Sequence, residues 1–205
     1  MSLHVLSHPL GAHLLTQLRD RATPPATFRS LSYQLSLLLA LEATRDLATV
    51  GQPVVTPMEP MTGRVLAQPL VVVPILRAGL GMLQPFQDLF SNLAVGFVGL
   101  ERDHVTAVAR SYYGKLPPVA GARVLVIDPM LATGGSAVQA VDMVKAAGGT
   151  DIGYVCVVAA PEGVACLGAA HPEVPIHTAA LDRALNERKY ILPGLGDFGD
   201  RLCGT

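Results

Sequence analysis

Charged residues and cysteines are scarce in this chain of 205 residues. Only 15% of the residues are charged and the formal net charge is -1, so a large nucleic-acid-binding surface is not favoured. The three cysteines, Cys156, Cys166 and Cys203, form no CxxC pair, which argues against a disulfide framework and suits a reducing compartment. We therefore expect a globular protein with no nucleic-acid partner.

Long apolar runs are also missing. The apolar runs are short and interrupted, so we expect no membrane-spanning helix. The first ten residues, MSLHVLSHPL, have neither the basic region nor the long apolar region of a signal peptide. These absences predict a cytoplasmic protein. Because half of the residues are hydrophobic, residues 1–205 suit one domain with a sizeable core.

Several catalytic and metal-binding patterns are absent as well. The chain contains no GxSxG and no HExxH, and its six histidines are dispersed. His4 and His8 are four residues apart, but they lie in an irregular start that Pro9 follows. We therefore predict no metal site built by protein side chains.

The apolar pattern predicts an α/β protein. Two helices are expected first, over residues 8–20 and from about 25 to 49, where Gly51, Gln52 and Pro53 end the second. Five nearly continuous apolar runs then predict strands buried on both faces, at 70–76, 93–100, 122–127, 153–160 and 174–180. Helices are predicted between them at 81–90, 135–147 and 162–171, which implies a parallel sheet. The polar segment 102–118 is expected to be a mobile loop or a projecting hairpin.

The stretch DPMLATGGS, at residues 128–136, follows one of these runs. Gly134 and Gly135 allow a sharp turn and a close approach of the backbone to a ligand. The first N–H groups of the following helix, with the hydroxyls of Thr133 and Ser136, would form an anion site. Asp128 would repel a phosphate, so it suits ribose hydroxyls. An ordinary strand-to-helix turn is the alternative, whereas a dinucleotide-binding loop is disfavoured because no GxGxxG follows the strand.

A second Gly-rich turn follows the run at residues 70–76, in the stretch PILRAGLGM. Arg77 stands at the strand end, and Gly79 and Gly81 follow it. A guanidinium can grip two oxygens at once, so this arrangement suits a pyrophosphate. The alternative is an arginine that caps a helix or pairs with a surface acid.

A third segment, YILPGLGDFGDR at residues 190–201, places acids and an arginine among glycines near the C-terminus. Such a loop presents backbone N–H and C=O groups at short range. A rigid loop of this kind can match the N3–H donor and the O2 and O4 acceptors of uracil. Cytosine would leave unpaired groups against it, which is an effective way to reject a near-isostere.

Together these three stretches resemble those of the uracil phosphoribosyltransferases. The resemblance implies the type I phosphoribosyltransferase fold, a parallel sheet flanked by helices with a C-terminal base-binding segment. It also implies an enzyme of pyrimidine salvage, a pentosyltransferase that converts uracil and phosphoribosyl pyrophosphate (PRPP) to UMP and pyrophosphate. Mg²⁺ would arrive bound to PRPP. Members of the family form oligomers and some respond to GTP, so the resemblance implies a homo-oligomer and makes GTP a candidate effector.

The resemblance also implies roles for individual residues. Catalytic roles fall to Asp197 and Arg102, although Arg102 could instead pair with the adjacent surface acids. The residues expected to bind PRPP are Arg77, Arg102, Asp128, Pro129, Met130, Leu131, Ala132, Thr133, Gly134, Gly135, Ser136 and Asp197. Those expected to bind uracil are Ile191, Gly196, Asp197 and Phe198.

Two departures and two alternatives stay open at this point. Phe198 replaces the alanine of many bacterial members, and its ring narrows the base site only if it turns toward the base. The tripeptide Glu187-Arg188-Lys189 also departs from the usual pattern. The alternatives are a phosphoribosyltransferase for another base and a pyrimidine-responsive RNA-binding regulator on the same fold. Sparse lysine, at Lys115, Lys145 and Lys189, disfavours the regulator.

Overall fold

A computed structural model describes residues 2–102 and 109–205, with no side chain described between residues 101 and 111. The helices are α1 (Pro9–Arg19), α2 (Pro25–Ala43), α3 (Leu80–Leu89), α4 (Gly135–Ala146), α5 (Pro161–Ala170) and α6 (Phe198–Cys203). The strands are β1 (Leu3–Val5), β2 (Thr49–Val55), β3 (Pro60–Leu66), β4 (Leu70–Leu76), β5 (Ala94–Val95), β6 (Phe97–Arg102), β7 (Ala109–Lys115), β8 (Arg123–Ile127), β9 (Met130–Leu131), β10 (Asp151–Ala159), β11 (Ile176–Leu181), β12 (Ala184–Leu185) and β13 (Ile191–Leu192).

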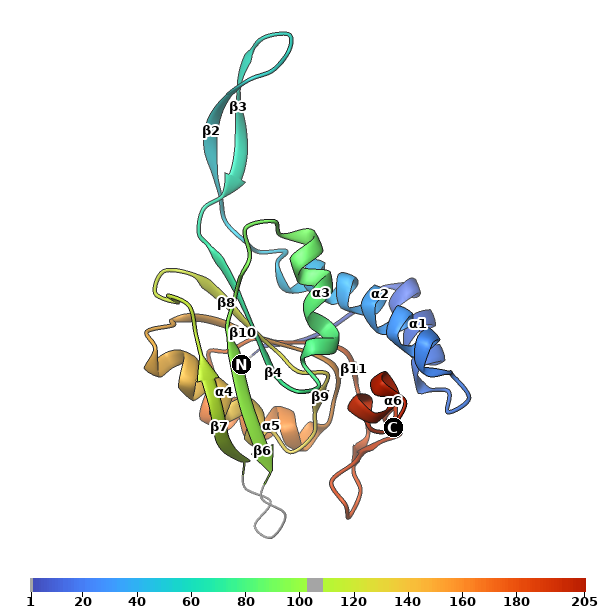
Figure 1. The fold of residues 1–205 in the computed structure, drawn as a ribbon. Helices are drawn as coiled ribbons and strands as arrows, with labels where there is room; N and C mark the ends of the chain where they lie inside the picture. The colour runs from blue at the N-terminus through green and yellow to red at the C-terminus, as the bar shows by residue number, and fades with distance from the viewer. Residues whose placement is uncertain (1, 103–108) are drawn as a thin grey trace.

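The main sheet has the order β1-β11-β10-β8-β4-β6-β7 (Figure 1). All of its pairs are parallel except β6 with β7, which is antiparallel. Short strands β5 and β9 add to β4 and β10. The prediction of a mostly parallel sheet flanked by helices is therefore confirmed.

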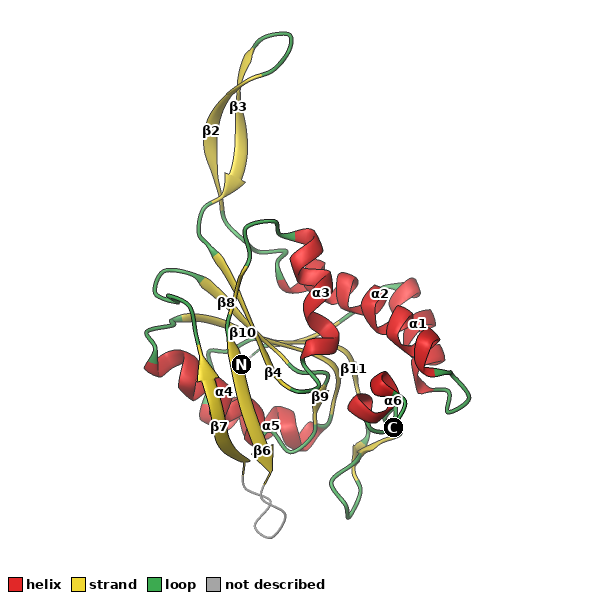
Figure 2. Ribbon diagram, in the orientation of Figure 1, coloured by secondary structure: helices red, strands yellow, loops and turns green. Residues whose placement is uncertain are grey.

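The central strands are buried on both faces because helices cover both sides of the sheet (Figure 2). Successive residues of β4, β8 and β10 alternate between two cores. One core packs Val72, Leu125 and Val155 under α1, α2, α3 and α6. The other packs Val124 and Tyr154 under α4 and α5. This double burial is why the strands appear in the sequence as nearly continuous apolar runs.

Parallel pairing brings the carboxyl ends of four strands to one edge of the sheet. The chain leaves β4 at Leu76, β8 at Ile127, β10 at Ala159 and β11 at Leu181. Ligands of open α/β sheets bind outside this edge. The loops that follow β4, β8 and β11 are therefore the places where a site is expected.

Three expectations about the first third of the chain are wrong. The start of the chain is not irregular at His4, because β1 pairs there with β11. Helix α2 ends at Ala43, not near residue 49, and the Thr44 hydroxyl donates to the Ala40 carbonyl (2.7 Å) where the backbone leaves the helix. The following residues form an antiparallel hairpin, β2 with β3, that the sequence did not predict. Its side chains are exposed along nearly its whole length, so no alternating apolar pattern marks it.

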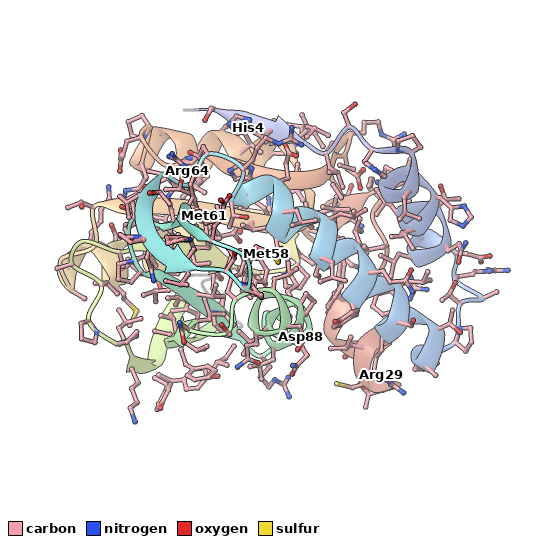
Figure 3. All side chains as sticks on the ribbon, turned by 90° about the horizontal axis from the view of Figure 1, so that it is seen from above. His4, Arg29, Met58, Met61, Arg64 and Asp88 are labelled. Carbon is pink, nitrogen blue, oxygen red and sulfur yellow. The ribbon has the colours of Figure 1, made fainter. Side chains whose placement is uncertain are left out.

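This hairpin projects away from the rest of the molecule and points toward the viewer in Figure 3, where Met58, Met61 and Arg64 are labelled. It carries a set of exposed apolar side chains, namely Val50, Val54, Val55, Met58, Met61, Val65 and Leu66. The segment 102–118 was expected to be a mobile loop or a projecting hairpin. In its described part, β7 pairs antiparallel with β6, as in a hairpin. In the described part of the chain, no helix combines the length and apolar character needed to cross a membrane.

Candidate functional site

The two Gly-rich loops lie side by side because β4 and β8 are neighbouring strands. Pro74 pairs with Ile127, the last residue of β8, and β4 continues for only two more residues, to Leu76. A Cβ on Gly79 would stand 2.7 Å from the Ile127 carbonyl oxygen, which is closer than real Cβ atoms approach. The glycine at position 79 therefore allows the loop after β4 to pack directly on the end of β8.

The loop after β8 is held from below by α5. Its strand β9 pairs with β10, and a Cβ on Gly163 of α5 would meet the Ala132 carbonyl oxygen at 2.5 Å. Gly134 then turns the chain into α4 with φ +87°, a left-handed conformation that favours glycine. Packing thus fixes the loop backbone from the strand end to the helix start, and the chain makes the sharp turn that was predicted at Gly134.

The amino-terminal end of α4 offers donors without a competing acceptor from its own first turn. Gly134 is the N-cap residue and supplies no capping side chain, and the first turn contains no acidic residue. A Cβ on Gly135 would meet no protein atom within 4 Å, so packing inside the chain does not require glycine there. This end of α4 has the properties of an anion site.

Asp128 is the carboxylate at the end of β8. It keeps a narrow exposed edge but is otherwise surrounded by protein atoms. This burial raises the pKa of Asp128 to about 7, although hydrogen bonds from the Met130 backbone N–H and the Tyr154 hydroxyl lower it. Near neutral pH, Asp128 therefore changes between a carboxylate, which only accepts hydrogen bonds, and a carboxylic acid, which also donates one.

The neighbours of Asp128 on β10 are neutral. Tyr154 pairs with Val126, two residues before Asp128, and lies on the sheet face that α4 and α5 cover. Burial, followed by the charge of Asp128, raises the pKa of Tyr154 well above its usual value of 10.0. Burial also raises the pKa of the Cys156 thiol to about 12. Tyr154 therefore serves as a protonated donor to the Asp128 carboxylate.

Arg77 is exposed immediately after β4, and the Leu76–Arg77 peptide bond is cis. The same loop leads into α3, which contacts the C-terminal segment. A Cβ on Gly81 would stand 2.8 Å from a methyl carbon of Leu202 and 2.9 Å from the Phe198 ring. The segment that runs from Arg77 into α3 therefore contacts α6 as well as β8.

The C-terminal segment folds into a small hairpin, β12 with β13, followed by α6. Ile191 is buried in β13, whereas Gly196 and Asp197 are exposed. Asp197 is the N-cap of α6 and accepts a hydrogen bond from the Asp200 backbone N–H (3.0 Å). The segment is thus an ordered loop that presents its backbone, not a frayed end.

Phe198 is only 1% exposed, and its ring lies in the core. The ring packs edge-on against Phe28 of α2, with ring centroids 5.2 Å apart. Of the two orientations left open by the sequence, the ring takes the one in which its side chain fills the protein interior. Only its backbone is then available to a base.

Residues to which the sequence analysis assigned no role surround these loops. Asp182 follows β11, Arg19 ends α1 and Arg201 lies in α6, and all three bond to the backbone at Gly194 or Leu195. An acid directly after a buried strand was a usable signal for Asp182, since the same signal marked Asp128. Nothing in the local sequence marks Arg19.

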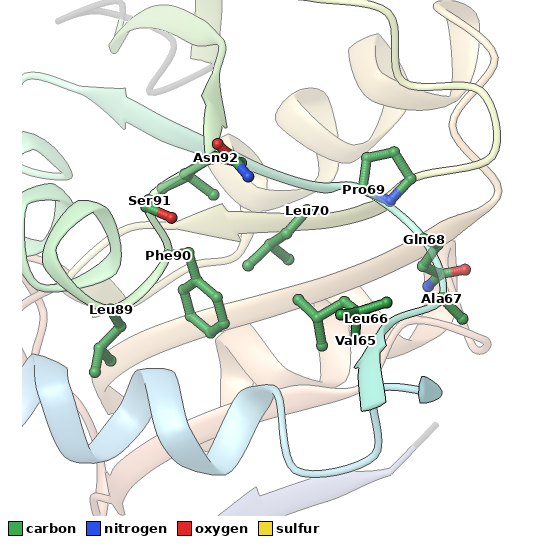
Figure 4. Close-up of a pocket in the computed structure, with 11 residues that line it drawn as sticks. Val65, Leu66, Ala67, Gln68, Pro69, Leu70, Leu89, Phe90, Ser91 and Asn92 are labelled. Carbon is green, nitrogen blue, oxygen red and sulfur yellow. The ribbon is translucent and has the colours of Figure 1, made fainter. Parts of the chain in front are cut away.

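One pocket lies at the opposite end of β4 from this edge. A pocket of about 590 Å³ opens at the amino end of β4, between the end of β3 and the end of α3 (Figure 4). Arg102 ends β6, and its side chain lies outside the described part of the structure. Among the described residues, no group of three or more His, Cys, Asp and Glu side chains could hold a metal ion.

Comparisons with known proteins agree over the length of the chain. The family model for uracil phosphoribosyltransferase matches residues 5–205. The uracil phosphoribosyltransferase of Roseiflexus castenholzii is 52% identical over 202 residues, covering 98% of this chain and 97% of that protein. That of Acidovorax ebreus is 48% identical over 206 residues, covering 100% and 99%. These relatives favour neither an RNA-binding regulator nor an enzyme for another base.

Solved structures agree on the fold. A protein from Aquifex aeolicus superposes with a TM-score of 0.94 at 36% identity, covering 98% of this chain and 97% of that one. A hypoxanthine-guanine phosphoribosyltransferase from Bacillus anthracis gives a TM-score of 0.53 at 12% identity, covering 77% and 80%, which shows a shared fold alone. The fold is therefore that of type I phosphoribosyltransferases, and the chain belongs to the uracil phosphoribosyltransferase family.

Proposed function

We propose that the chain transfers the phosphoribosyl group of PRPP to uracil and releases pyrophosphate, so that it forms UMP in pyrimidine salvage. One observation carries the proposal. The loops after β4 and β8 meet at the carboxyl edge of the sheet, and the C-terminal segment packs at Gly81 on the start of α3, directly after the first of these loops. An anion site, a carboxylate suited to ribose and a base-sized backbone loop therefore belong to one place.

The loop after β8 would hold the sugar phosphate. The 5′-phosphate would accept hydrogen bonds from the backbone and hydroxyls of residues 133–136 at the amino end of α4. Asp128, in its ionised form, would accept hydrogen bonds from the ribose hydroxyls. Residues 129–132 connect the two and would approach PRPP through their backbone. The cover of α5 behind Ala132 supports this assignment, because it keeps the loop in one conformation.

The pyrophosphate would lie toward the neighbouring strands. Arg77 is exposed at the end of β4 and can direct its guanidinium to phosphate oxygens. Arg102 ends β6, which pairs with β4 in parallel, so the backbone of Arg102 lies toward the same carboxyl edge of the sheet as Arg77. We assign both arginines to the charge of the leaving pyrophosphate.

The base would lie on the C-terminal segment. Ile191, Gly196, Asp197 and Phe198 would contact uracil, the last of them through backbone atoms alone. N3–H and the carbonyl oxygens of uracil require a fixed pattern of acceptors and donors, and cytosine presents the opposite pattern at N3 and C4. Asp197 is exposed at the start of α6, where its carboxylate can order the base near the ribose.

In the reaction, uracil N1 displaces pyrophosphate from the ribose C1 as positive charge develops on the ring. The protein would contribute orientation and charge stabilisation. Mg²⁺ bound to PRPP would supply charge neutralisation for the pyrophosphate. Asp128 in its ionised form would offer one carboxylate oxygen to such a cation, whose other ligands would be phosphate oxygens and water.

The remaining expectations are proposals of the same kind. Residues 1–205 would act as one domain in the cytoplasm, a location that suits the unpaired Cys156, Cys166 and Cys203. A homo-oligomer is supported by the exposed apolar side chains of the β2–β3 hairpin, and light scattering on the purified chain tests it. The proposal that GTP acts as an effector is tested by measuring UMP formation with and without GTP.

A panel of bases tests the main proposal. Pyrophosphate release from PRPP and Mg²⁺ is measured with uracil, cytosine, hypoxanthine and orotate in separate reactions. We expect release with uracil alone. Release with another base but not with uracil would show that this other base is the substrate. Release with none of the bases would argue against a phosphoribosyltransferase.

A further inference from the structure

A buried ion pair holds the loop between Ile191 and Gly196. Asp182, which directly follows β11, accepts two hydrogen bonds from the Arg19 guanidinium, at 2.6 and 2.9 Å. The second oxygen of this pairing also accepts the Gly194 backbone N–H at 2.9 Å. Arg19 in turn donates to the Gly194 carbonyl at 2.7 Å. Both backbone polar groups of Gly194 are thus fixed by one arginine–aspartate pair.

The pair is well shielded from water. The Asp182 side chain is 4% exposed and that of Arg19 is 24% exposed. A buried carboxylate needs its partners, because an unpaired charge in the interior is strongly unfavourable. The two-point contact between the guanidinium and the carboxylate also fixes their relative orientation. This pair is therefore a rigid bracket and differs from the exposed ion pairs of the surface, which hold their partners loosely.

The loop needs such a bracket because its own backbone is permissive. Gly194 has φ +61° and Gly196 has φ +81°, conformations that glycine adopts at little steric cost but also leaves easily. Arg201 adds a second support, since it donates to the Leu195 carbonyl at 2.7 Å and to the carbonyls of Leu18 and Asp20 at the end of α1. The end of α1 therefore holds the loop at two successive residues, at Gly194 directly through Arg19 and at Leu195 through Arg201.

We propose that Arg19 and Asp182 are positioning residues for base recognition, which hold the backbone at Gly194 so that the loop presents uracil with a fixed set of donors and acceptors. The inference rests on the proposed function, because it takes the segment from Ile191 to Phe198 as the base site. Neither side chain needs to touch the base. The pair acts on the affinity for the base and on the rejection of cytosine, and the loops that bind PRPP are held independently by β8 and α5.

The test separates positioning from simple stabilisation by measuring kcat and both KM values. In Asp182→Asn, one oxygen is kept for the Gly194 N–H but the charge that fixes Arg19 is lost. In Arg19→Lys, the charge is kept but the two-point contact is lost. We expect each variant to raise KM for uracil by about tenfold, the equivalent of ~1.4 kcal/mol. KM for PRPP should stay within roughly twofold of the wild-type value, because the loops that we propose for PRPP binding are unchanged in both variants.

A matched control exists at the other end of the sheet. Arg123 and Asp46 also form a two-point pair, at 3.0 and 3.2 Å, beside the amino end of β8, but the Asp46 side chain is 71% exposed. Asp46→Asn removes the negative charge that faces Arg123 and leaves the loop at Gly194 untouched. It should leave KM for uracil unchanged.

Removing one partner of a buried pair can also unfold the chain. The double variant Arg19→Gln with Asp182→Asn therefore accompanies the single ones, because two neutral amides leave no unpaired charge. We expect it to fold and still to show the raised KM for uracil. Variants that lower the melting temperature but leave KM for uracil at the wild-type value would overturn the positioning role.

Hydrogen exchange keeps this inference separate from the proposed function. Backbone amides at residues 190–197 should exchange faster in Asp182→Asn than in the wild type, whether or not the chain uses uracil. If the wild type makes no UMP but the loop exchanges faster in the variant, the bracket is real and the proposed function fails. Unchanged exchange at these amides would show that the pair does not hold the loop.

Discussion

Phe198 and Phe28 pack edge to face in the core, with ring centroids 5.2 Å apart. The Arg201 guanidinium lies over the Phe28 ring, 4.5 Å from its centre. The Phe198 ring thus joins α6 to α2. Only the backbone at this position is left for the base contact that we propose.

Phe198→Ala should therefore affect stability and leave selectivity unchanged. We expect a loss of about 3–5 kcal/mol in the free energy of unfolding, the usual cost of removing a buried phenylalanine ring. Relative kcat/KM for uracil and for uracils with a bulky group at C5 should match the wild type. Denaturant unfolding and steady-state kinetics measure the two quantities. A variant that newly accepts the bulky bases would place the ring beside the base.

Two adjacent glycines at the start of α4, Gly134 and Gly135, should respond differently to alanine. Gly134 has φ +87°, and a Cβ there would stand 2.7 Å from Cys166 Cβ, so Gly134→Ala should lower both stability and activity. A Cβ on Gly135 would meet no protein atom within 4 Å, so Gly135→Ala should fold normally. It should still lower kcat/KM for PRPP on the order of 10- to 100-fold, because the added methyl group displaces the phosphate.

Melting temperature and PRPP kinetics, measured on both glycine variants, separate these effects. Full activity in Gly135→Ala would mean that no ligand approaches this end of α4. Normal stability in Gly134→Ala would mean that the loop relaxes around the new side chain.

The raised pKa of Asp128 should appear in the stability of the folded chain. Its folded pKa of about 7 lies above the ordinary 3.8, so the folded state favours the protonated form. The stabilising contribution is complete below pH ~4 and is lost as the pH rises through about 7. Asp128→Asn should therefore raise the melting temperature at pH 8, and the gain should shrink toward pH 4. A gain that does not vary with pH would contradict the burial of this charge.

Tyr154→Phe should move the acidic limb of the pH profile for PRPP use. The Tyr154 hydroxyl lowers the pKa of Asp128, so its removal should raise that pKa further. More of Asp128 is then protonated near neutral pH, and kcat/KM for PRPP should fall there but recover at higher pH. Tyr33→Phe is the control, because Tyr33 donates to Asp88 at the surface (2.6 Å). An acidic limb at the same pH in both variants would remove Tyr154 from this role.

Much of the site could be predicted because its signals are local. The loop at residues 128–136 follows an apolar run and contains its own turn-forming glycines, and β8, the loop and α4 were found at the expected places. The same holds for β4 and the turn at Arg77. Strand-sized apolar runs predict buried parallel strands because both faces of this sheet are covered.

What could not be predicted depends on contacts between distant parts of the chain. Arg19 and Asp182 are 163 residues apart and meet only when α1 packs beside the end of β11. Tyr154 reaches Asp128 only through the pairing of β10 with β8. The β2–β3 hairpin was missed for another reason, since Gly51 and Pro53 suggested a break and no buried face marks its strands.

Formation of UMP by Asp197→Asn and Asp200→Asn, compared with the wild type, is the most direct measurement. Asparagine at 197 can still cap α6, so the first variant removes the charge but keeps the local fold. Asp200 lies three residues further on in α6 and is the control. With uracil, PRPP and Mg²⁺, we expect turnover in the wild type and the control, and a loss of roughly 10²-fold or more in Asp197→Asn. Equal turnover in all three would remove Asp197 from the reaction, and no UMP from the wild type would contradict a site that joins uracil to PRPP.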